Sequence, residues 1–536
     1  MIVRMKHLDL VCVAADRAQT LERLRTLGAV HLDLAAANGR PVAAARGEIE
    51  EAEKAVRLVL KARGKRIVEN LSERTVAEIL AIDADRATLV TERERLEREI
   101  KAYEPYGDFD PDLARKLVEK GVDLTDVLPA KLPTMRLSAM RAKLSDVEVR
   151  IAVADSQLAS ADEQSVLKNF PQLRDRLAFE QALELMSAQG AVAVVSGWVP
   201  ESQVDGLSSA ARDAGWGLLL REPAEGEIPP TLIRPPRFVR PVKALFEGLG
   251  IAPAYDEADV SVPFMCYFSL FFAILVGDGA YGAIFLVATL LMRKKMPRSW
   301  FALMSVFSLA TIAWGALSNT WFGAGIPWCA NWPTVRWLSG ADASAGHQYD
   351  NMMFLCFTIG VSHLMLARLW NGLCTLNDRA CLSQFGWAGI VLFMYVLTNA
   401  IVGIFGGIPT WCFWMFGVSF LVVFWQAKGM DKGMLFLNAM SVLGDIISYV
   451  RLFAVGLASV KVAENFNAMA IDLGLPIWIK WLPLVLILLV GHGLNLAMAG
   501  LSVLVHAVRL NTLEFSNHKG ISWAGYAFRP FIKTKE

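Results

Sequence analysis

The stretch LGDIISYVRLFAVGLASVKVAENFN, residues 443–467, carries charged and polar side chains within a largely apolar segment. A membrane-spanning helix needs about 20 mostly apolar residues, and the apolar pattern predicts one over residues 435–468. Arg451 would lie about 24 Å along that helix, at about 1.5 Å per residue, and so near the middle of a bilayer. A cation at that depth costs ~2.5–3.5 kcal/mol on insertion scales. Arg451 therefore needs a compensating partner.

Two kinds of partner for Arg451 are compatible with the sequence. One is an internal salt bridge with a carboxylate on a neighbouring span, for which Asp278 is the obvious candidate. The other is a carboxylate of a different subunit, which Arg451 would meet along an ion path. We favour the second interpretation.

Further polar groups lie in this predicted span and in the next one, over residues 478–513. Asp445 and Ser448 are three residues apart, so they share a helix face and form a polar path toward Arg451. Lys461 and Glu464 have the same spacing and can pair with each other. In the last span His506 stands three residues before Arg509. His363 and His492 are more often core histidines than proton relays.

The composition divides the chain into two halves. It has 536 residues, of which 54% are hydrophobic, and its mean hydropathy is +0.39. Residues 261–536 hold 17 basic and 10 acidic residues, against 36 and 42 in residues 1–260. This partition predicts a water-exposed first half and a lipid-embedded second half. The near-zero net charge argues against a nucleic-acid-binding protein. The seven cysteines form no disulfide framework, and Cys374 and Cys381 suit no common metal site.

Uncharged runs predict eight spans, of which the last two exceed thirty residues and must tilt or protrude. The spans are placed near residues 261–277, 280–293, 300–322, 352–376, 384–406, 411–427, 435–468 and 478–513. With the N-terminus inside, eleven basic residues fall on inner segments and two on outer loops. The positive-inside rule therefore puts both termini in the cytoplasm. No signal-peptide pattern opens the chain, which agrees with a cytoplasmic first half.

The first half reads as two lobes and two long arms. A β-α-β unit begins near Val3, has its second strand through residues 30–34, and forms a proximal α/β lobe from residues 1–43 and 191–222. A strand, a GWVP turn, a helix and another strand complete that lobe. Heptad-like spacing predicts arms over residues 44–103 and 137–190, which fold back as an antiparallel coiled coil around a small distal lobe, residues 104–136. The alternative is a helical bundle. Two further segments follow these elements: a proline-rich linker over residues 223–260 and, after the membrane domain of residues 261–515, a cytoplasmic tail over residues 516–536.

The two heptad seams are read directly from the apolar positions. The first seam consists of Ile79, Ile82, Arg86, Leu89, Arg93, Leu96, Ile100 and Tyr103. The second seam consists of Leu137, Met140, Leu144, Val147, Ile151, Ala154 and Leu158. Helical arms of this length connect distant parts of an assembly and do not enclose a binding site. They therefore predict a rod that acts as a lever.

These motifs carry a family resemblance. Residues 443–467 resemble the arginine-bearing helix of the a/I subunit of V-type and archaeal-type rotary ATPases, and VHAVRLNTLEF, residues 505–515, resembles the helix that follows it. YDEADVSVPF (255–264) and GDGAYG (277–282) resemble the family's entry into the membrane, and SGWVP (196–200) its soluble lobe. The resemblance runs through nearly the whole chain in order. The expected fold is an α-helical membrane domain of about eight helices, with cytoplasmic α/β lobes bridged by an antiparallel coiled coil.

The resemblance implies the function of a non-hydrolytic stator in a compact bacterial form. Arg451 is then the arginine that faces the proteolipid ring, and Arg509 is its companion. Two ion half-channels for H⁺ or Na⁺ flank that contact, with candidate polar groups Asp445, Ser448, Glu464, His492, Asn495 and His506. Ser459 and Ala499 stand where many eukaryotic relatives have histidine and glutamate, so the outer half-channel must use other groups.

Partners and location also follow from the resemblance. The implied partners are the proteolipid c-ring, a peripheral-stalk E/G-type heterodimer, a central-rotor cap subunit of the C/d type and membrane lipid. The implied location is a prokaryotic inner membrane. We expect no cofactor and no bound metal.

Two rival interpretations remain open. GxxxxGK[ST] is absent, since the sole Gly-Lys pair, Gly64-Lys65, lacks the rest of the motif, so the chain should not hydrolyse ATP. A free-standing secondary transporter could use GDGAYG as a broken-helix binding site, but this gives no reason for the long arms. A membrane enzyme would need a catalytic cluster, and the sequence offers none.

Overall fold

The computed structural model describes residues 2–34, 37, 39–64, 71–120, 128–129, 131–340, 347–427, 429–473 and 476–533. The chain divides into two compact units. The sheet unit consists of residues 5–224 and 529–536, and the membrane unit consists of residues 1–4 and 225–528. Each unit has its own hydrophobic core.

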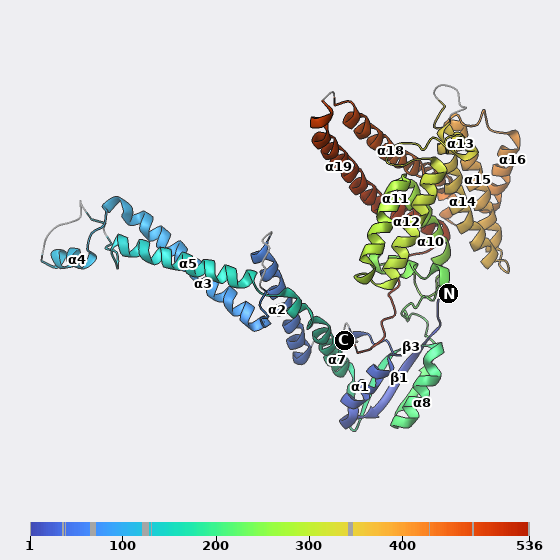
Figure 1. Ribbon diagram of the computed structural model, residues 1–536. Helices are drawn as coiled ribbons and strands as arrows, with labels where there is room; N and C mark the ends of the chain where they lie inside the picture. Colours follow the sequence, from blue (N-terminus) through green and yellow to red (C-terminus); the bar gives the residue numbers. More distant parts are fainter. Residues whose placement is uncertain are drawn as a thin grey trace. The chain divides into compact units, whose positions relative to one another are not determined.

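A four-stranded antiparallel sheet forms the lobe of the sheet unit (Figure 1). Its order is β2 (Ser187–Gln189), β3 (Val192–Pro200), β1 (Met5–Val13) and β4 (Gly217–Arg221). Met5 pairs with Pro200 and Val13 with Val192. Alternate residues of β1 point into the core, as a period of two requires. The helices α1 (Arg17–Leu27) and α8 (Val204–Ala214) follow β1 and β3, and both contribute leucines to the core.

Two predictions about this lobe are wrong. The second strand, expected over residues 30–34, is reduced to one bridge in which His31 and Trp198 exchange backbone hydrogen bonds of 2.8 and 2.9 Å. GWVP is not a turn, because it forms the end of β3. The bridge explains the glycine of this motif: a Cβ at Gly197 would lie 2.6 Å from the carbonyl oxygen of His31.

Each predicted arm is divided into shorter helices. The first arm consists of α2 (Arg40–Arg63) and α3 (Val76–Tyr103). The second consists of α5 (Leu137–Ala159), α6 (Glu163–Leu167) and α7 (Phe170–Leu185). The distal segment holds α4 (Pro111–Glu119), while residues 121–127 and 130 of the predicted lobe lie outside the described residues.

The helices α3 and α5 run side by side and antiparallel (Figure 1). The direction follows from the paired residues, because Arg86 contacts Asp155 at 2.5 Å and Glu104 contacts Arg141 at 2.7 Å. The predicted seam positions Ile79, Leu89 and Leu96 are buried. They pack in two clusters with apolar residues of α5, which also lie at predicted seam positions. A heptad seam thus predicted the contact surface, whereas supercoiling stays a prediction.

The linker and the C-terminal segment are held in place by short contacts. Residues 231 and 252 form parallel bridges with residues 527 and 524, and α9 (Val242–Leu249) packs into the core of the membrane unit. Phe531 then belongs to the core of the sheet unit, where its N–H donates to the carbonyl of Val30 at 2.7 Å. The predicted tail is therefore structural in both units.

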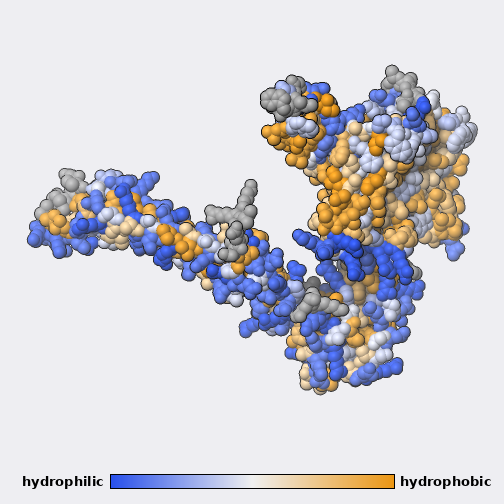
Figure 2. Space-filling model, viewed as in Figure 1, coloured by the Kyte–Doolittle hydropathy of each residue, from blue (hydrophilic) through white to orange (hydrophobic). Residues whose placement is uncertain are grey.

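Helices form in all eight stretches predicted to span a membrane. They are α10 (Ser261–Val276), α11 (Gly279–Leu291), α12 (Arg298–Ser318), α14 (Asp350–Cys374), α15 (Ala380–Ile401), α16 (Thr410–Gln426), α17 (Asp431–Ile447) with α18 (Val450–Ile471), and α19 (Ile477–Ser502). A short helix, α13 (Pro333–Ser339), lies in the loop before α14. The outer surface of these helices is predominantly hydrophobic (Figure 2).

Length and composition alone support five spans, or six if α10 and α11 cross together. The last two stretches, Lys432–Ile471 and Lys480–Lys519, are 40 residues each. At about 1.5 Å per residue each is about 60 Å long, twice the ~30 Å hydrocarbon core. The predicted excess length is confirmed, and the count of eight stays a prediction.

A sharp turn separates α10 from α11. The two axes are bent by 117°, so α10 and α11 do not continue as one straight helix. Gly277 ends α10 in the left-handed region, with φ of 71°. On the other side of the turn α11 packs very closely on α12, because a Cβ on Gly315 would lie 2.2 Å from the backbone nitrogen of Gly279. Such small-residue contacts let membrane helices approach each other.

Candidate functional site

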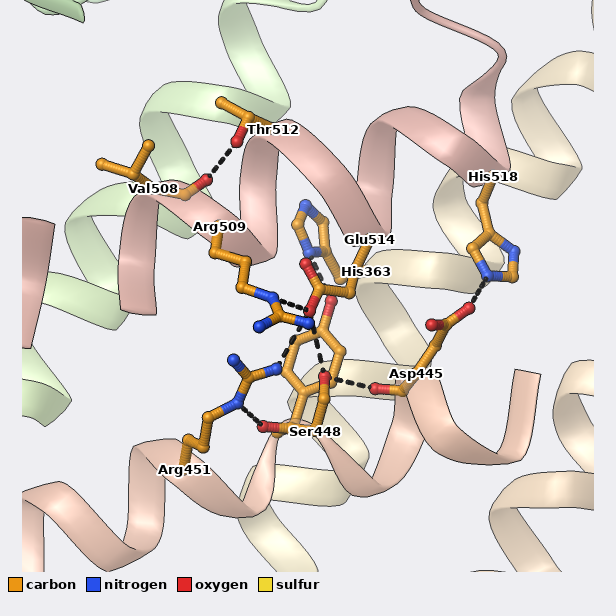
Figure 3. Close-up of polar contacts among 10 residues, drawn as sticks. His363, Asp445, Ser448, Arg451, Val508, Arg509, Thr512, Glu514 and His518 are labelled. Carbon is orange, nitrogen blue, oxygen red and sulfur yellow. Dashed lines mark hydrogen bonds and ion pairs between the residues drawn. The ribbon is translucent and has the colours of Figure 1, made fainter. Parts of the chain in front are cut away.

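Arg451 stands at the start of α18, directly after a break in the long seventh stretch. The break separates α17 from α18 at Ser448 and Tyr449. Its Nε donates a hydrogen bond of 2.9 Å to the carbonyl of Ser448, and its Nη2 donates one of 3.0 Å to Oε1 of Glu514 (Figure 3). The guanidinium is thus held at both ends.

Glu514 is shared by two arginines. Arg509 Nε lies 3.3 Å from the same Oε1 atom that Arg451 contacts, and both side chains point toward it in Figure 3. Glu514 is only 4% exposed. Its other oxygen, Oε2, has no hydrogen-bond partner among the described residues. Two cations and one carboxylate leave this cluster with a formal charge of +1 if all three are ionised.

The sequence did not indicate this role of Glu514, because a residue five positions after Arg509 lies about 140° around an α-helix from it. The last stretch is not α-helical here. It contains two π-helical segments, η7 (Val503–Ala507) and η8 (Leu510–Phe515), on either side of Arg509. In a π-helix, hydrogen bonds join residues five apart, so Arg509 and Glu514 meet on the same side. Such π segments occur often at functional sites.

Asp278, the predicted internal partner of Arg451, is occupied elsewhere. Its Oδ1 accepts a hydrogen bond of 2.8 Å from the N–H of Ala280 and so caps α11. Its Oδ2 accepts a hydrogen bond of 2.8 Å from the N–H of Gly323. The carboxyl group is almost fully buried, at 1% exposed. The candidate Asp278 is therefore wrong, because the turn itself uses both oxygens. The internal salt bridge considered as the alternative is nevertheless present, with Glu514 of the last stretch as the carboxylate.

A second polar cluster lies on the α17 side of Arg451. Nε2 of His518 lies 3.1 Å from Oδ2 of Asp445, and Arg368 Nε donates 3.1 Å to the other ring nitrogen of His518. We call Asp445, His518 and Arg368 the histidine network. Ser448 lies between the histidine network and the arginine pair. Its hydroxyl is 3.5 Å from Oε1 of Glu514 and donates a hydrogen bond of 2.6 Å to the carbonyl of Asp445. The Asp445 carboxylate itself is directed to His518, a residue that the sequence did not single out. The polar path through Asp445 and Ser448 stays a prediction.

A third cluster lies on the other side of Arg451, and we call it the tyrosine network. It consists of Ser459, Asn495, Tyr281, His492 and Asn467. The hydroxyl of Tyr281 lies 2.8 Å from His492 Nδ1 and accepts 3.0 Å from Asn495 Nδ2. Ser459 donates 3.1 Å to Asn495, and His492 Nε2 lies 3.1 Å from Asn467. These contacts make a continuous hydrogen-bonded chain between α11, α18 and α19.

Asn495 and His492 were expected from the sequence as candidates, and both belong to this network. Tyr281 and Asn467 were not. Tyr281 belongs to GDGAYG, whose glycines drew attention to the turn, and it is buried at 1% exposed. A helical pattern alone gives no sign that its hydroxyl would reach the last span.

Three other predicted residues stay outside both networks. Glu464 pairs with Lys461 at 2.6 Å, as their spacing indicated, and both line a cavity of about 340 Å³. His506 has a buried Nδ1 without a hydrogen-bond partner in the described part of the chain. His363 is fully buried between the rings of Tyr267 and Phe515, with Nδ1 2.9 Å from the hydroxyl of Tyr449. That position agrees with the interpretation of His363 as a core histidine.

Within the described ranges no group of three or more His, Cys, Asp or Glu side chains is arranged to hold a metal ion.

Comparison with known proteins identifies several relatives. The chain is 32% identical to V-type ATP synthase subunit I of Borreliella burgdorferi, over 69% of this chain and 64% of that protein. It is 29% identical to V-type ATP synthase subunit I 1 of Treponema pallidum, over 99% of this chain and the whole of that protein. It is 24% identical to A-type ATP synthase subunit I of Methanocaldococcus jannaschii, over 79% and 67%. No protein-family model matches the chain.

Proposed function

Because the chain is a homologue of subunit I of the V-type and A-type ATP synthases, we propose that it is the membrane stator that conducts ions against a ring of proteolipid subunits. The chain is a membrane protein of a rotary ATPase, and subunit I is a non-catalytic part of that complex. The proposal extends this to the two half-channels, to transport of protons or sodium coupled to ATP hydrolysis or synthesis, and to a prokaryotic inner membrane.

The observation that carries the proposal is the placement of the arginine pair between two polar networks. Along α18, Ser459 follows Arg451 by eight residues, about 12 Å at the standard helical rise. Asp445 precedes it by six residues, about 9 Å on the same scale. The tyrosine network and the histidine network would then be parts of two half-channels, with Arg451 between them.

The charge of the cluster suits a passing carboxylate. A carboxyl group in lipid must be neutral, because an unpaired ion there is very costly. Near an opposite charge its ionised form is favoured. Arg451, Arg509 and Glu514 carry a formal charge of +1 together, so an internal pair with Glu514 still leaves attraction for a carboxylate of a proteolipid. Arginine keeps its charge at any working pH, so it also opposes leakage of cations between the half-channels.

The exposed apolar surface of the last stretch supplies a face for such a ring. The Lys480–Lys519 stretch has the lowest buried share of the five candidate spans, 17%. Its large exposed side chains are Trp481, Leu482, Val485, Leu486, Leu489, Val490, Leu494, Met498, Leu501, Leu504, Val505 and Leu513. Arg509, whose side chain is 55% exposed, lies within this series. A rotating apolar ring could slide on such a face and still present its carboxylates to the arginines.

For the sheet unit we propose the anchoring role that the resemblance implies. The paired helices α3 and α5 would bind the peripheral-stalk heterodimer, and the lobe would contact the central-rotor cap subunit. The exposed faces of these helices carry many charged side chains, several in ion pairs such as Arg95 with Glu99 and Lys143 with Glu92. Such a face suits a modest, partly polar contact.

The alternative function, a free-standing secondary transporter, depends on GDGAYG as a binding site. Both carboxylate oxygens of Asp278 are engaged by backbone N–H groups and the residue is 1% exposed, so this carboxylate holds the turn together and is poorly accessible to a substrate. The stator interpretation needs no such group.

Purification under mild conditions separates the two functions. A stator co-purifies with proteolipids and nucleotide-binding subunits, which mass spectrometry of the solubilised complex detects, and a transporter does not. In reconstituted vesicles, Arg451→Lys should abolish coupled transport while the complex still assembles, because an ammonium lacks the planar fork of the guanidinium. Normal transport by an assembled Arg451→Lys complex would contradict the proposal.

A further inference from the structure

A basic hollow lies where the linker meets the start of α12. It has a volume of about 780 Å³ and is lined by five cationic side chains, namely Arg234, Arg237, Arg240, Lys243 and Arg298. One carboxylate, that of Glu247, lies in the lining. In the described part of the chain, no carboxylate forms an ion pair with Arg237, Arg240, Lys243 or Arg298. So many cations around one hollow repel each other unless an anion joins them.

The hollow is held rigidly by the core beneath it. Val239 and Val242 are buried, at 1% and 0% exposed, and they belong to the same core cluster as Phe264 and Leu303 of the membrane helices. A Cβ on Gly248 would lie 2.8 Å from the ring of Trp300, so α9 packs closely on α12. The linker cations and Arg298 are therefore presented from two elements that are fixed to each other.

Exposed apolar side chains lie close in the sequence to the cations that line the hollow. Phe238, between Arg237 and Arg240, is 73% exposed. Leu291, at the end of α11, is 80% exposed, and the next residue, Met292, is 49% exposed. The chain enters α12 shortly afterwards, at Arg298. Cations next to exposed apolar side chains at the end of candidate spans are what the boundary between lipid tails and headgroups requires.

We propose that this hollow binds the phosphate-bearing headgroup of an anionic membrane lipid, with the exposed apolar side chains against its acyl chains. Guanidinium groups bind phosphate oxygens in pairs, and four of the five cations are arginines. The volume lies within the range of small-molecule sites, about 300–1,000 Å³. A free phosphate ion has the same charge chemistry, but it would gain nothing from Phe238 and Leu291. The site is independent of the arginine pair at Glu514 and of the proposed ion transport.

The test measures binding of phosphatidylglycerol to the purified full chain in nonionic detergent, by native mass spectrometry across a titration. The first variant carries Arg237→Gln, Arg240→Gln and Lys243→Gln. The matched control carries Arg293→Gln, Lys294→Gln and Lys295→Gln, which removes the same number of positive charges from the segment after α11, at residues that do not line the hollow. Cations near a membrane surface contribute roughly additively to binding of anionic lipid, so we expect the first variant to lose affinity about tenfold or more and the control to lose much less.

Three outcomes would overturn the proposal. Equal losses in both triple variants would show only a general effect of charge. Equal binding of phosphatidylcholine would show that the anionic headgroup is not recognised. Displacement of the lipid by inorganic phosphate at similar concentration would assign the hollow to a soluble anion. If the first variant fails to fold, the single change Arg298→Gln provides the same comparison, with a smaller expected loss, and wild-type affinity in that variant would count against the site.

Discussion

Replacing Arg451 and Arg509 by alanine, singly and together, tests whether Glu514 is a buried anion held by two guanidinium groups. In Arg451→Ala the carboxylate keeps Arg509 at 3.3 Å. The loss is then about one hydrogen bond to a charged group, roughly 1.5–3 kcal/mol. Arg509→Ala should cost less, because its side chain is 55% exposed and exposed ion pairs contribute only about 0–1 kcal/mol. The double variant leaves Glu514 without either cation, which costs ~3–5 kcal/mol for an uncompensated buried charge.

Adding Glu514→Gln to the double variant should restore most of that stability, because the buried charge is then absent. The measurements are the free energy of unfolding of the purified chain in detergent and the amount of assembled complex. Coupled transport in reconstituted vesicles is measured beside them, and it should be lost in Arg451→Ala even where assembly is retained. A double variant as stable as the wild type, or one that Glu514→Gln does not rescue, would refute the reasoning about the shared carboxylate.

Three further predictions concern separate parts of the chain. Tyr281→Phe removes the hydroxyl between His492 and Asn495, so ion transport should fall while assembly is kept, at a cost of roughly 1–3 kcal/mol for the polar groups left unpaired. The matched control is Tyr395→Phe, whose hydroxyl lies 2.8 Å from Thr358 in neither network, and equal transport in the two variants would contradict the half-channel. Burial lowers the pKa of His31 below its usual value, so folding favours its neutral form. The contribution of His31 to the stability of the sheet unit should be fully present above the usual histidine pKa of about 6.5 and should be lost as the pH falls from there through the lowered pKa of the folded state. The protection factors of the amides at the His31–Trp198 bridge, which correct the exchange rate for its intrinsic pH dependence, should therefore fall in acid and fall less in His31→Gln, and an equal acid response of the two proteins would contradict this. In a background without the seven native cysteines, a single cysteine at Lys294 should react with an impermeant reagent only from the cytoplasmic side, and labelling from outside would overturn the topology.

Local patterns in the sequence predicted the elements well. Apolar runs located helices in all eight stretches, and heptad spacing identified the buried positions of α3 and α5. Both properties depend on residues close together in the chain, where the periodicity of a helix is already expressed. The free-energy cost of placing a cation in the membrane also identified Arg451 as a functional candidate, because a charged side chain in an apolar stretch requires a compensating partner.

The failures arose where tertiary structure decides the outcome. The partner of Arg451 is Glu514 and not Asp278, because the turn after α10 satisfies both Asp278 oxygens. The strand expected over residues 30–34 does not pair with β1, since β1 already has β3 and β4 on its two edges, and it forms a single bridge from His31 to Trp198 of β3. The sequence pattern within a segment does not show which hydrogen-bonding groups and strand edges are already paired with other parts of the chain.

The position of Glu514 bears on how the proposed stator would work between encounters with the ring. A lone arginine would face lipid or ring without a counter-charge whenever no proteolipid carboxylate was opposite it, at the cost that buried unpaired cations carry. With Oε1 of Glu514 at 3.0 Å, Arg451 always has a partner inside its own subunit. An arriving carboxylate would therefore share the guanidinium groups and would not need to rescue a stranded charge. The excess positive charge of the pair would still favour its ionisation. The bond to Glu514 would then lower the energy difference between the engaged and the disengaged arginine, so that the ring could leave as readily as it arrives.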